Sequence, residues 1–252
     1  MMFEELLYKE TLQIEWNKLS ENLELTVNEF IKQSLLCADL SPEHNIKDLI
    51  NKDSMEKFEA LTHLLQNELA NIGLYETGVF DNCTEQLGEK IKLWIILGSL
   101  VEMTMQIFLS VYMSDYERAH WLQWKDFEIG KTDRVLVESI DELFNKGIIN
   151  KDVSKSLKNS LKDTIKKHTK VKQIDKIMLD ELIQFFSEME IIGDEEKKQL
   201  KTIQKNRNCI HAYSNREIDS WKCLTESVYF FLYLLKKFTR RFPDTSYIYD
   251  SL

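Results

Sequence analysis

Glycine and proline are so scarce in this chain that it has few places at which to turn. The 252 residues include 7 Gly and 2 Pro, well below the average usage in globular proteins. Charged residues make up 30% of the chain, and Leu, Ile, Lys and Glu are abundant, as an all-helical soluble protein requires. No alternation of period two extends beyond a few residues. The sequence therefore predicts an all-α fold.

Helical periodicity of the apolar residues divides the chain into a series of helices. We expect them at about residues 3–36, 55–72, 84–113, 134–145, 154–168, 177–189, 195–211 and 217–238. The expected N-terminal caps are Asp53-Ser54, Thr84 and Asp194. Gly147 is expected to close the helix that precedes it, and residues 114–132 read as irregular. No repeat of fixed period and no linker rich in Pro, Gly or Ser divides the chain, which indicates one helical domain with an N-terminal extension.

One predicted segment, residues 93–113, is about long enough to span a bilayer. However, Glu102 and Gln106 fall near its middle, and a central carboxylate in lipid costs roughly 2.5 kcal/mol or more. A buried core helix is therefore the better interpretation, and no membrane span is expected. The N-terminus carries acidic residues where a signal peptide would carry basic ones, which favours a cytoplasmic protein.

The cysteines and most of the histidines give no sign of a metal site. The four cysteines, Cys37, Cys83, Cys209 and Cys223, lie far apart and show no ligand spacing. We therefore expect neither structural zinc nor a disulfide framework, as in a reducing cytoplasm. The histidines outside the motif described below, His44, His63, His120 and His168, have no acidic or cysteine partner at ligand spacing. No metal or other cofactor is expected.

The net charge of −9 conceals a division along the chain. Residues 1–90 hold 7 Lys and no Arg against 18 acidic residues, whereas residues 151–176 hold nine Lys against three Asp. An overall acidic protein is a poor non-specific binder of nucleic acid, but a local basic segment can still receive an anion. The alternative is that these lysines form a solvated helix face.

The motif with the most chemical content is Arg207-Asn208-Cys209-Ile210-His211. On one continuous helix, Arg207 and His211 would project from the same face. An arginine that holds a phosphate and a histidine that moves a proton together suit the cleavage of RNA. The alternative is structural: Arg207 forms a buried ion pair with Glu102, and His211 is a satisfied histidine near the core.

Gly98 lies four residues before Glu102 and on the same face of the predicted helix. A glycine in mid-helix costs about 1 kcal/mol relative to alanine, so the close approach of another helix should offset this cost. We expect the helix that carries Arg207 to be that neighbour. Glu102 would then hold Arg207 in place.

Three parts of the sequence resemble, in this order, the HEPN-like helical domains of prokaryotic toxin, phage-defence and nucleotidyltransferase-partner proteins. They are residues 97–102, residues 177–183 with 190–193, and residues 200–212. The resemblance covers about residues 87–238. It implies a HEPN-like helical bundle in residues 87–252 with a helical insertion at about 114–173. Residues 1–86 would form an acidic helical extension packed on this core.

Catalytic HEPN-like proteins are metal-independent endoribonucleases, often dimers in which two copies of an arginine–histidine motif form one cleft. The resemblance implies a toxin or abortive-infection enzyme that cuts RNA, such as tRNA, by attack of the 2′-hydroxyl. It also implies a homodimer formed through the helices around the motif and the C-terminal helix. The family motif has four to six residues between Arg and His. Here three residues separate Arg207 from His211, and the gap is five when counted from Lys205.

The expected catalytic residues are Arg207, His211, Asn208 and Glu102, and the expected substrate-binding residues are Lys205 and Tyr213. Arg207 would brace the phosphate and His211 would transfer the proton. Asn208 would orient the base or the phosphate. An antitoxin or another protein is a further expected partner. The alternative is a non-catalytic HEPN-like helical module that binds a partner protein or a nucleotide, with the acidic N-terminal residues as its interaction arm.

Overall fold

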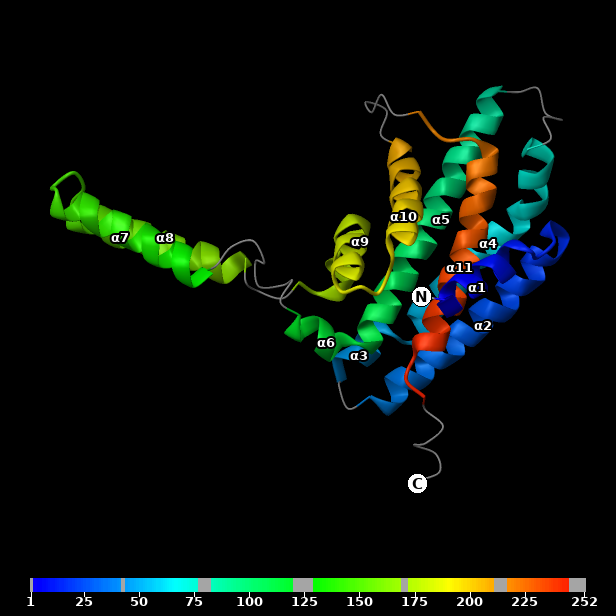
Figure 1. Ribbon diagram of the computed structural model, residues 1–252, viewed down its shortest axis with the longest axis horizontal. Coiled ribbons are helices and arrows are strands. Elements are labelled where there is room, and N and C mark those ends of the chain that lie inside the picture. Colours follow the sequence, from blue (N-terminus) through cyan, green and yellow to red (C-terminus); the bar gives the residue numbers. More distant parts are fainter. Residues whose placement is uncertain are drawn as a thin grey trace. The chain divides into compact units, whose positions relative to one another are not determined.

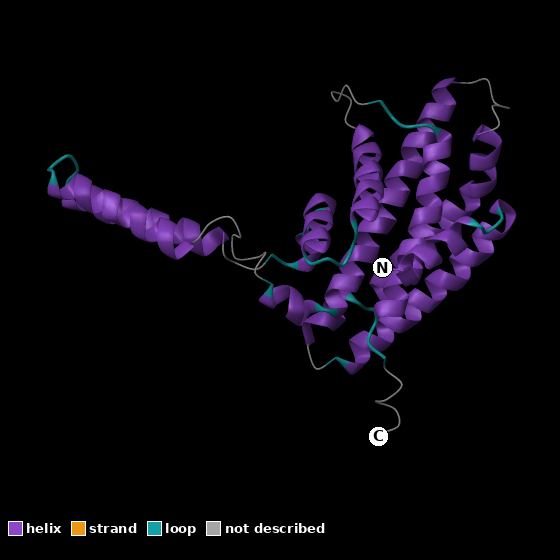
Figure 2. Ribbon diagram, in the orientation of Figure 1, coloured by secondary structure: helices purple, strands orange, loops and turns teal. Residues whose placement is uncertain are grey.

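The computed structural model describes residues 2–41, 44–76, 83–119, 129–168, 172–210 and 217–244 (Figure 1). Nearly all of these residues are helical, and no strand occurs among them (Figure 2). The prediction of an all-α protein is therefore confirmed. The finer assignment to a HEPN-like bundle, and the division at residue 86, stay predictions.

The described α-helices are α1 (Met2–Leu12), α2 (Trp16–Leu40), α3 (His44–Leu49), α4 (Lys52–Glu76), α5 (Cys83–Val111), α6 (Met113–Arg118), α7 (Ile129–Asn145), α8 (Lys151–His168), α9 (Leu179–Glu188), α10 (Asp194–Arg207) and α11 (Trp221–Arg241). Two short 3-10 helices are η2 (Ile174–Lys176) and η3 (Asn208–Ile210). The chain forms two compact units. The bundle unit comprises Met1–Tyr112 with Ile177–Leu252, and the hairpin unit comprises Met113–Lys176.

Helices α5 and α11 form the centre of the bundle unit (Figure 1). Helix α11 packs against α1, α2, α4, α5 and α10, and α5 also packs against α2, α4, α9 and α10. Residues 230–235 of α11 are buried without interruption, so every face of the helix is covered there. The aromatic side chains of this helix therefore belong to the core of a single chain. The dimer interface that the sequence predicts through this helix stays a prediction.

Helix α5 is long and apolar enough to cross a membrane by length and composition. Within the structure, however, 61% of its most apolar 18-residue window is buried. Helices α4, α10 and α11 pack against it, and Trp94, Leu97 and Leu100 are fully buried. This packing supports the interpretation of α5 as a core helix.

The predicted N-terminal helix is wrong in one respect, because a bend at residues 13–15 divides it into α1 and α2. The backbone carbonyl of Ile14 accepts a 2.8 Å hydrogen bond from the Tyr229 hydroxyl. The Trp16 indole N–H donates to the carbonyl of Leu69 at 3.2 Å. Contacts with distant parts of the chain thus stabilise the bend, and local periodicity does not reveal such contacts.

The predicted cap of α4 is also wrong. The helix begins at Lys52, and Asp53 lies inside its first turn. The Ser54 backbone N–H donates to the Asn51 side-chain oxygen, and the Asn51 backbone N–H donates to the Ser54 hydroxyl, both at 3.0 Å. Asn51 and Ser54 therefore satisfy each other's backbone donors, as in a capping box.

The segment predicted to be irregular is partly helical, because it contains α6 and the first residues of α7. Residues 120–128 lie outside the described residues. Tyr116 of α6 is buried, and its hydroxyl donates to the carbonyl of Lys172 at 3.1 Å. Gly147 follows α7 with a φ of +69°, a conformation that favours glycine, and it closes the helix as predicted.

Lys237 of α11 carries a charge into the bundle core, where its side chain is 2% exposed. Its Nζ lies 2.6 and 2.8 Å from the two carboxylate oxygens of Glu196 on α10. The Tyr233 hydroxyl also donates to Glu196, and burial together with this carboxylate raises the pKa of Tyr233. Glu4 of α1 lies 3.6 Å from the Lys237 Nζ. The network therefore joins α1, α10 and α11.

Replacing Lys237 by methionine should lower the free energy of unfolding by about 3–5 kcal/mol, because Glu196 would lose its buried counter-charge. Urea denaturation followed by circular dichroism measures the change. Lys236→Met is the matched control, since Lys236 is the neighbouring residue on α11 but is partly exposed. Its effect should stay within about 0.5 kcal/mol. Equal effects of the two substitutions would contradict a stabilising role for the buried network.

Candidate functional site

The sequence segments that carry the family resemblance lie on or directly beside α5, α9 and α10, and α10 packs against both other helices. Gly193 is the N-cap of α10, and its backbone N–H donates to the Glu196 carboxylate at 2.7 Å. Asp194, the predicted cap, is instead the first helical residue. Because Glu196 also binds Lys237, the N-terminal end of α10 is attached to the core, and its C-terminal end reaches the middle of α5.

The side chain of Arg207 crosses α5 at Gly98. A Cβ atom at Gly98 would lie 2.6 Å from the Arg207 Cδ and 3.0 Å from its Cβ and Cγ. The Arg207 Nη1 forms an ion pair with the Glu102 Oε2, and the two side chains are 25% and 13% exposed. The predicted meeting of Gly98, Glu102 and the helix of Arg207 is therefore confirmed. Glu102 fixes one side of the Arg207 guanidinium.

The motif does not continue along one α-helix as the sequence predicted. Helix α10 ends at Arg207, and Asn208 is its C-cap and the first residue of η3. Asparagine competes with the helix for backbone hydrogen bonds, which explains an end in this Asn-rich stretch. His211 and Tyr213, the predicted proton-transfer and substrate-binding residues, lie outside the described residues.

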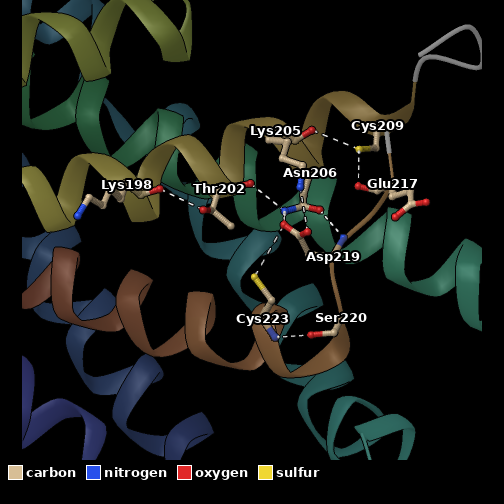
Figure 3. A network of polar contacts seen from close by, with 9 residues as sticks. All are labelled: Lys198, Thr202, Lys205, Asn206, Cys209, Glu217, Asp219, Ser220 and Cys223. Atoms are coloured by element: carbon tan, nitrogen blue, oxygen red, sulfur yellow. Dashed lines mark hydrogen bonds and ion pairs between the residues drawn. The ribbon is translucent and has the colours of Figure 1, made fainter. Parts of the chain in front are cut away.

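A polar network joins the end of α10 to the start of α11 (Figure 3). Asn206 is 1% exposed, and its Nδ2 donates to the Asp219 Oδ2 at 2.7 Å and to the carbonyl of Thr202 at 2.9 Å. The Asp219 backbone N–H donates to the Asn206 Oδ1 at 2.8 Å. Lys205, a predicted substrate-binding residue, places its Nζ 2.9 Å from the Asp219 Oδ1. The network fixes the backbone on both sides of the motif.

Asp219, like Asn206, is a residue of this site that the sequence analysis missed. Partial burial acts to raise its pKa, but hydrogen bonds from Asn206 and Lys205 and the charge of Lys205 outweigh burial and lower the pKa. A signal for Asp219 was present, because Asp-Ser before an apolar run is typical of a helix start. Helix α11 does begin there, and the Ser220 hydroxyl accepts the Cys223 backbone N–H at 3.2 Å.

Two cysteines lie at the edges of the polar network (Figure 3). The Cys209 Sγ is 3.3 Å from the carbonyl oxygen of Lys205, and the Cys223 Sγ is 4.0 Å from the Asp219 Oδ2. Burial and the nearby carboxylate of Asp219 raise the pKa of the Cys223 thiol, which keeps it in the unreactive protonated form. Among the described residues, no group of His, Cys, Asp and Glu is arranged to hold a metal ion.

Arg207 is the described residue of the motif whose side chain is suited to bind a ligand. Its guanidinium has five N–H donors, one side faces Glu102, and a quarter of the side chain is exposed. Such a group can hold a phosphate or a carboxylate through paired hydrogen bonds. Asp219 is a poor base, since Asn206 and Lys205 stabilise its charged form. The described residues can thus bind and orient an anion, and proton transfer would require a group from the following segment.

Gly98→Ala should lower the free energy of unfolding by about 1–3 kcal/mol, because the new methyl group would overlap the Arg207 side chain. Gly88→Ala is the matched control on the same helix, since no atom lies within 4 Å of its added Cβ. That substitution should raise the free energy of unfolding by about 0.5–1 kcal/mol. A stabilising effect of Gly98→Ala in urea denaturation would contradict the close approach of the two helices.

Asp219→Asn should lower the free energy of unfolding by about 1 kcal/mol at neutral pH, because the ion pair with Lys205 is lost. Since folding lowers the pKa of Asp219, its charge stabilises the protein above the unfolded-state pKa, and this contribution disappears as the pH falls through the folded-state pKa. The two proteins should therefore converge in stability below about pH 4. A pH-independent difference in urea denaturation would contradict this assignment.

No model of a known protein family matches the chain, and comparisons with curated proteins and with solved structures also give no match. The function must therefore be argued from the residues of this chain and their geometry.

Proposed function

We propose that the protein is a HEPN-like, metal-independent endoribonuclease of a toxin or phage-defence system. The observation that carries the proposal is the position of Arg207, which Glu102 holds across Gly98 at the end of α10. A fixed, partly exposed guanidinium is suited to a phosphodiester, because it offers paired donors in a planar arrangement. The segment with His211 follows directly in the sequence.

Arg207 binds the scissile phosphate in this proposal, and Glu102 positions Arg207 without touching the substrate. His211 accepts the proton of the ribose 2′-hydroxyl, whose oxygen attacks the phosphorus atom. The bond from phosphorus to the 5′-oxygen breaks, and the leaving oxygen takes up a proton. The product is a 2′,3′-cyclic phosphate. Asn208 orients the base or the phosphate, and Lys205 and Tyr213 contact the RNA.

The cellular assignment is part of the same proposal. The protein acts in the cytoplasm on RNA such as tRNA, as a homodimer that joins two copies of the motif in one cleft. An antitoxin or another partner protein restrains it. The packing of α5 inside the bundle unit supports a protein without a membrane span, since other helices cover most of its apolar window.

A non-catalytic module that binds a partner protein or a nucleotide is the second candidate. It is favoured by the contacts of Lys205 and Asn206, which both bind Asp219 and thereby serve the connection between α10 and α11. The Arg207–Glu102 pair would then serve the fold as well. In this case the acidic helices α1–α4 form the binding surface. They do so as part of the bundle and not as a separate arm, since α1, α2 and α4 pack against α11.

Purified protein should cut total RNA or tRNA in the presence of EDTA, and Arg207→Ala and His211→Ala should each reduce the rate by roughly 10²–10⁴-fold. Lys201→Ala is the matched control, since Lys201 is an exposed cation on the same helix. Gel electrophoresis of the products and detection of 2′,3′-cyclic ends measure the reaction.

Three outcomes separate the candidates. Cleavage that Lys201→Ala retains and both site variants lose would support the ribonuclease. No cleavage by a folded protein would favour the non-catalytic module. Cleavage that survives both Arg207→Ala and His211→Ala would show that the site assignment is wrong.

A further inference from the structure

Helices α7 and α8 form an antiparallel pair, here called the α7–α8 hairpin (residues 129–168), within the hairpin unit (Figure 1). The two helices pack against each other, and the Lys158 Nζ lies 2.6 Å from the Asp141 Oδ1 between them. Gly147, with its positive φ, allows the chain to reverse direction at the tip. Each of these two helices therefore packs against the other.

The hairpin exposes an unusual set of large apolar side chains, here called the apolar seam. Each is at least 37% exposed, and the seam consists of Leu136, Leu143, Phe144, Ile148, Val153 and Leu157. Two amphipathic helices cover only part of each other's apolar faces, whereas four helices around a common axis cover them fully. Apolar side chains exposed together in this way are typical of surfaces that bind another molecule.

The spacing within the seam is that of helices that pack in bundles. Leu136 and Leu143 are seven residues apart on α7, and Val153 and Leu157 are four apart on α8. Each pair therefore lies on one face of its helix. An extended peptide would not match two parallel rows of this spacing, but another pair of helices would.

The two helices also carry opposite charges. Helix α7 has two basic against four acidic side chains, a net charge of −2, and α8 has six Lys against two Asp, a net charge of +4. Glu138 and Glu142 on α7 and Lys155 and Lys162 on α8 are exposed. The contact between Lys158 and Asp141 shows that the two charge types pair when the helices lie side by side.

We propose that the hairpin of a second copy of this chain covers the apolar seam and forms an antiparallel four-helix bundle with it. If α7 and α8 alternate around the axis of that bundle, each acidic α7 lies between two basic α8 helices. In a two-fold symmetric pair, each hairpin uses the same surface to cover the apolar side chains of the other and to pair with its charges. This association goes beyond the proposed ribonuclease activity and does not depend on it.

Charge and polarity favour a second copy over RNA at this surface. A phosphate backbone would pair with the lysines of α8, but it would repel the acidic α7 and leave the apolar seam against a charged ligand. A second hairpin avoids both costs, since it brings an apolar face and both signs of charge. The seam therefore argues against a purely solvated or RNA-binding role for these lysines.

Sedimentation of the full chain should show a dimer that depends on the seam. Leu136→Gln combined with Leu157→Gln should raise the dissociation constant by at least about 100-fold while circular dichroism stays unchanged, because glutamine favours helix as leucine does. Leu64→Gln combined with Leu87→Gln is the matched control. These leucines are 51% and 46% exposed on α4 and α5, and the control should remain a dimer.

Two charge-reversal variants, one on each helix, test the proposal without the leucine substitutions. Glu138→Lys with Glu142→Lys makes α7 basic, and Lys155→Glu with Lys162→Glu removes the positive charge of α8. Each variant alone should associate more weakly than the wild type. An equal mixture of the two should associate more strongly than either alone, and added salt should weaken this gain.

Several results would overturn the proposal. One is a monomeric wild type at about 100 µM, a concentration that suits even a weak dimer. Another is a seam variant that dimerises as well as the control, which would place the contact elsewhere. A mixture of charge variants with no gain in association would also overturn it. A monomeric wild type whose RNA binding falls in the Lys155→Glu, Lys162→Glu variant would assign the surface to RNA instead.

Discussion

The ion pair between Arg207 and Glu102 is the interaction on which the rest of the site depends. Glu102 lies in the most apolar of the described helices, where a carboxylate without a partner would be costly. Arg207 reaches it only because Gly98 has no side chain in the path. The glycine and the two charged residues therefore act as one constraint, since removing either charge would leave the other partly buried and unpaired. The fold itself fixes where the guanidinium lies.

Polar contacts at both ends extend this constraint along α10. The buried residues of the helix are Leu200, Ile203 and Asn206, a narrow stripe that by itself would allow sliding or rotation. Glu196 binds Lys237 at the N-terminal end, and Arg207 binds Glu102 at the C-terminal end. Hydrogen bonds and ion pairs are directional, so they restrict the position and rotation of a helix more than apolar packing does. The position of Arg207 is thus set from both ends of α10.

The all-α class, the core position of α5 and the meeting of Gly98 with the Arg207 helix could be predicted from the sequence. Each depends on local composition or on helical spacing, which one sequence displays directly. The bend before Trp16 and the end of α10 at Arg207 could not be predicted in this way. The bend depends on a hydrogen bond from Tyr229, which is far away in the sequence. The contact between Asn206 and Asp219 likewise joins two helices whose pairing local patterns do not encode.

A cleft built from two copies of the motif requires a surface through which two chains associate. Residues 230–235 of α11 offer no such surface, because they are buried on all sides within one chain. The hairpin unit differs, because its own two long helices leave the apolar seam exposed. Arg207 and the seam proposed for association lie in different compact units. Seam variants that lose association and keep Arg207 and Glu102 would therefore reveal whether catalysis requires two motifs or one.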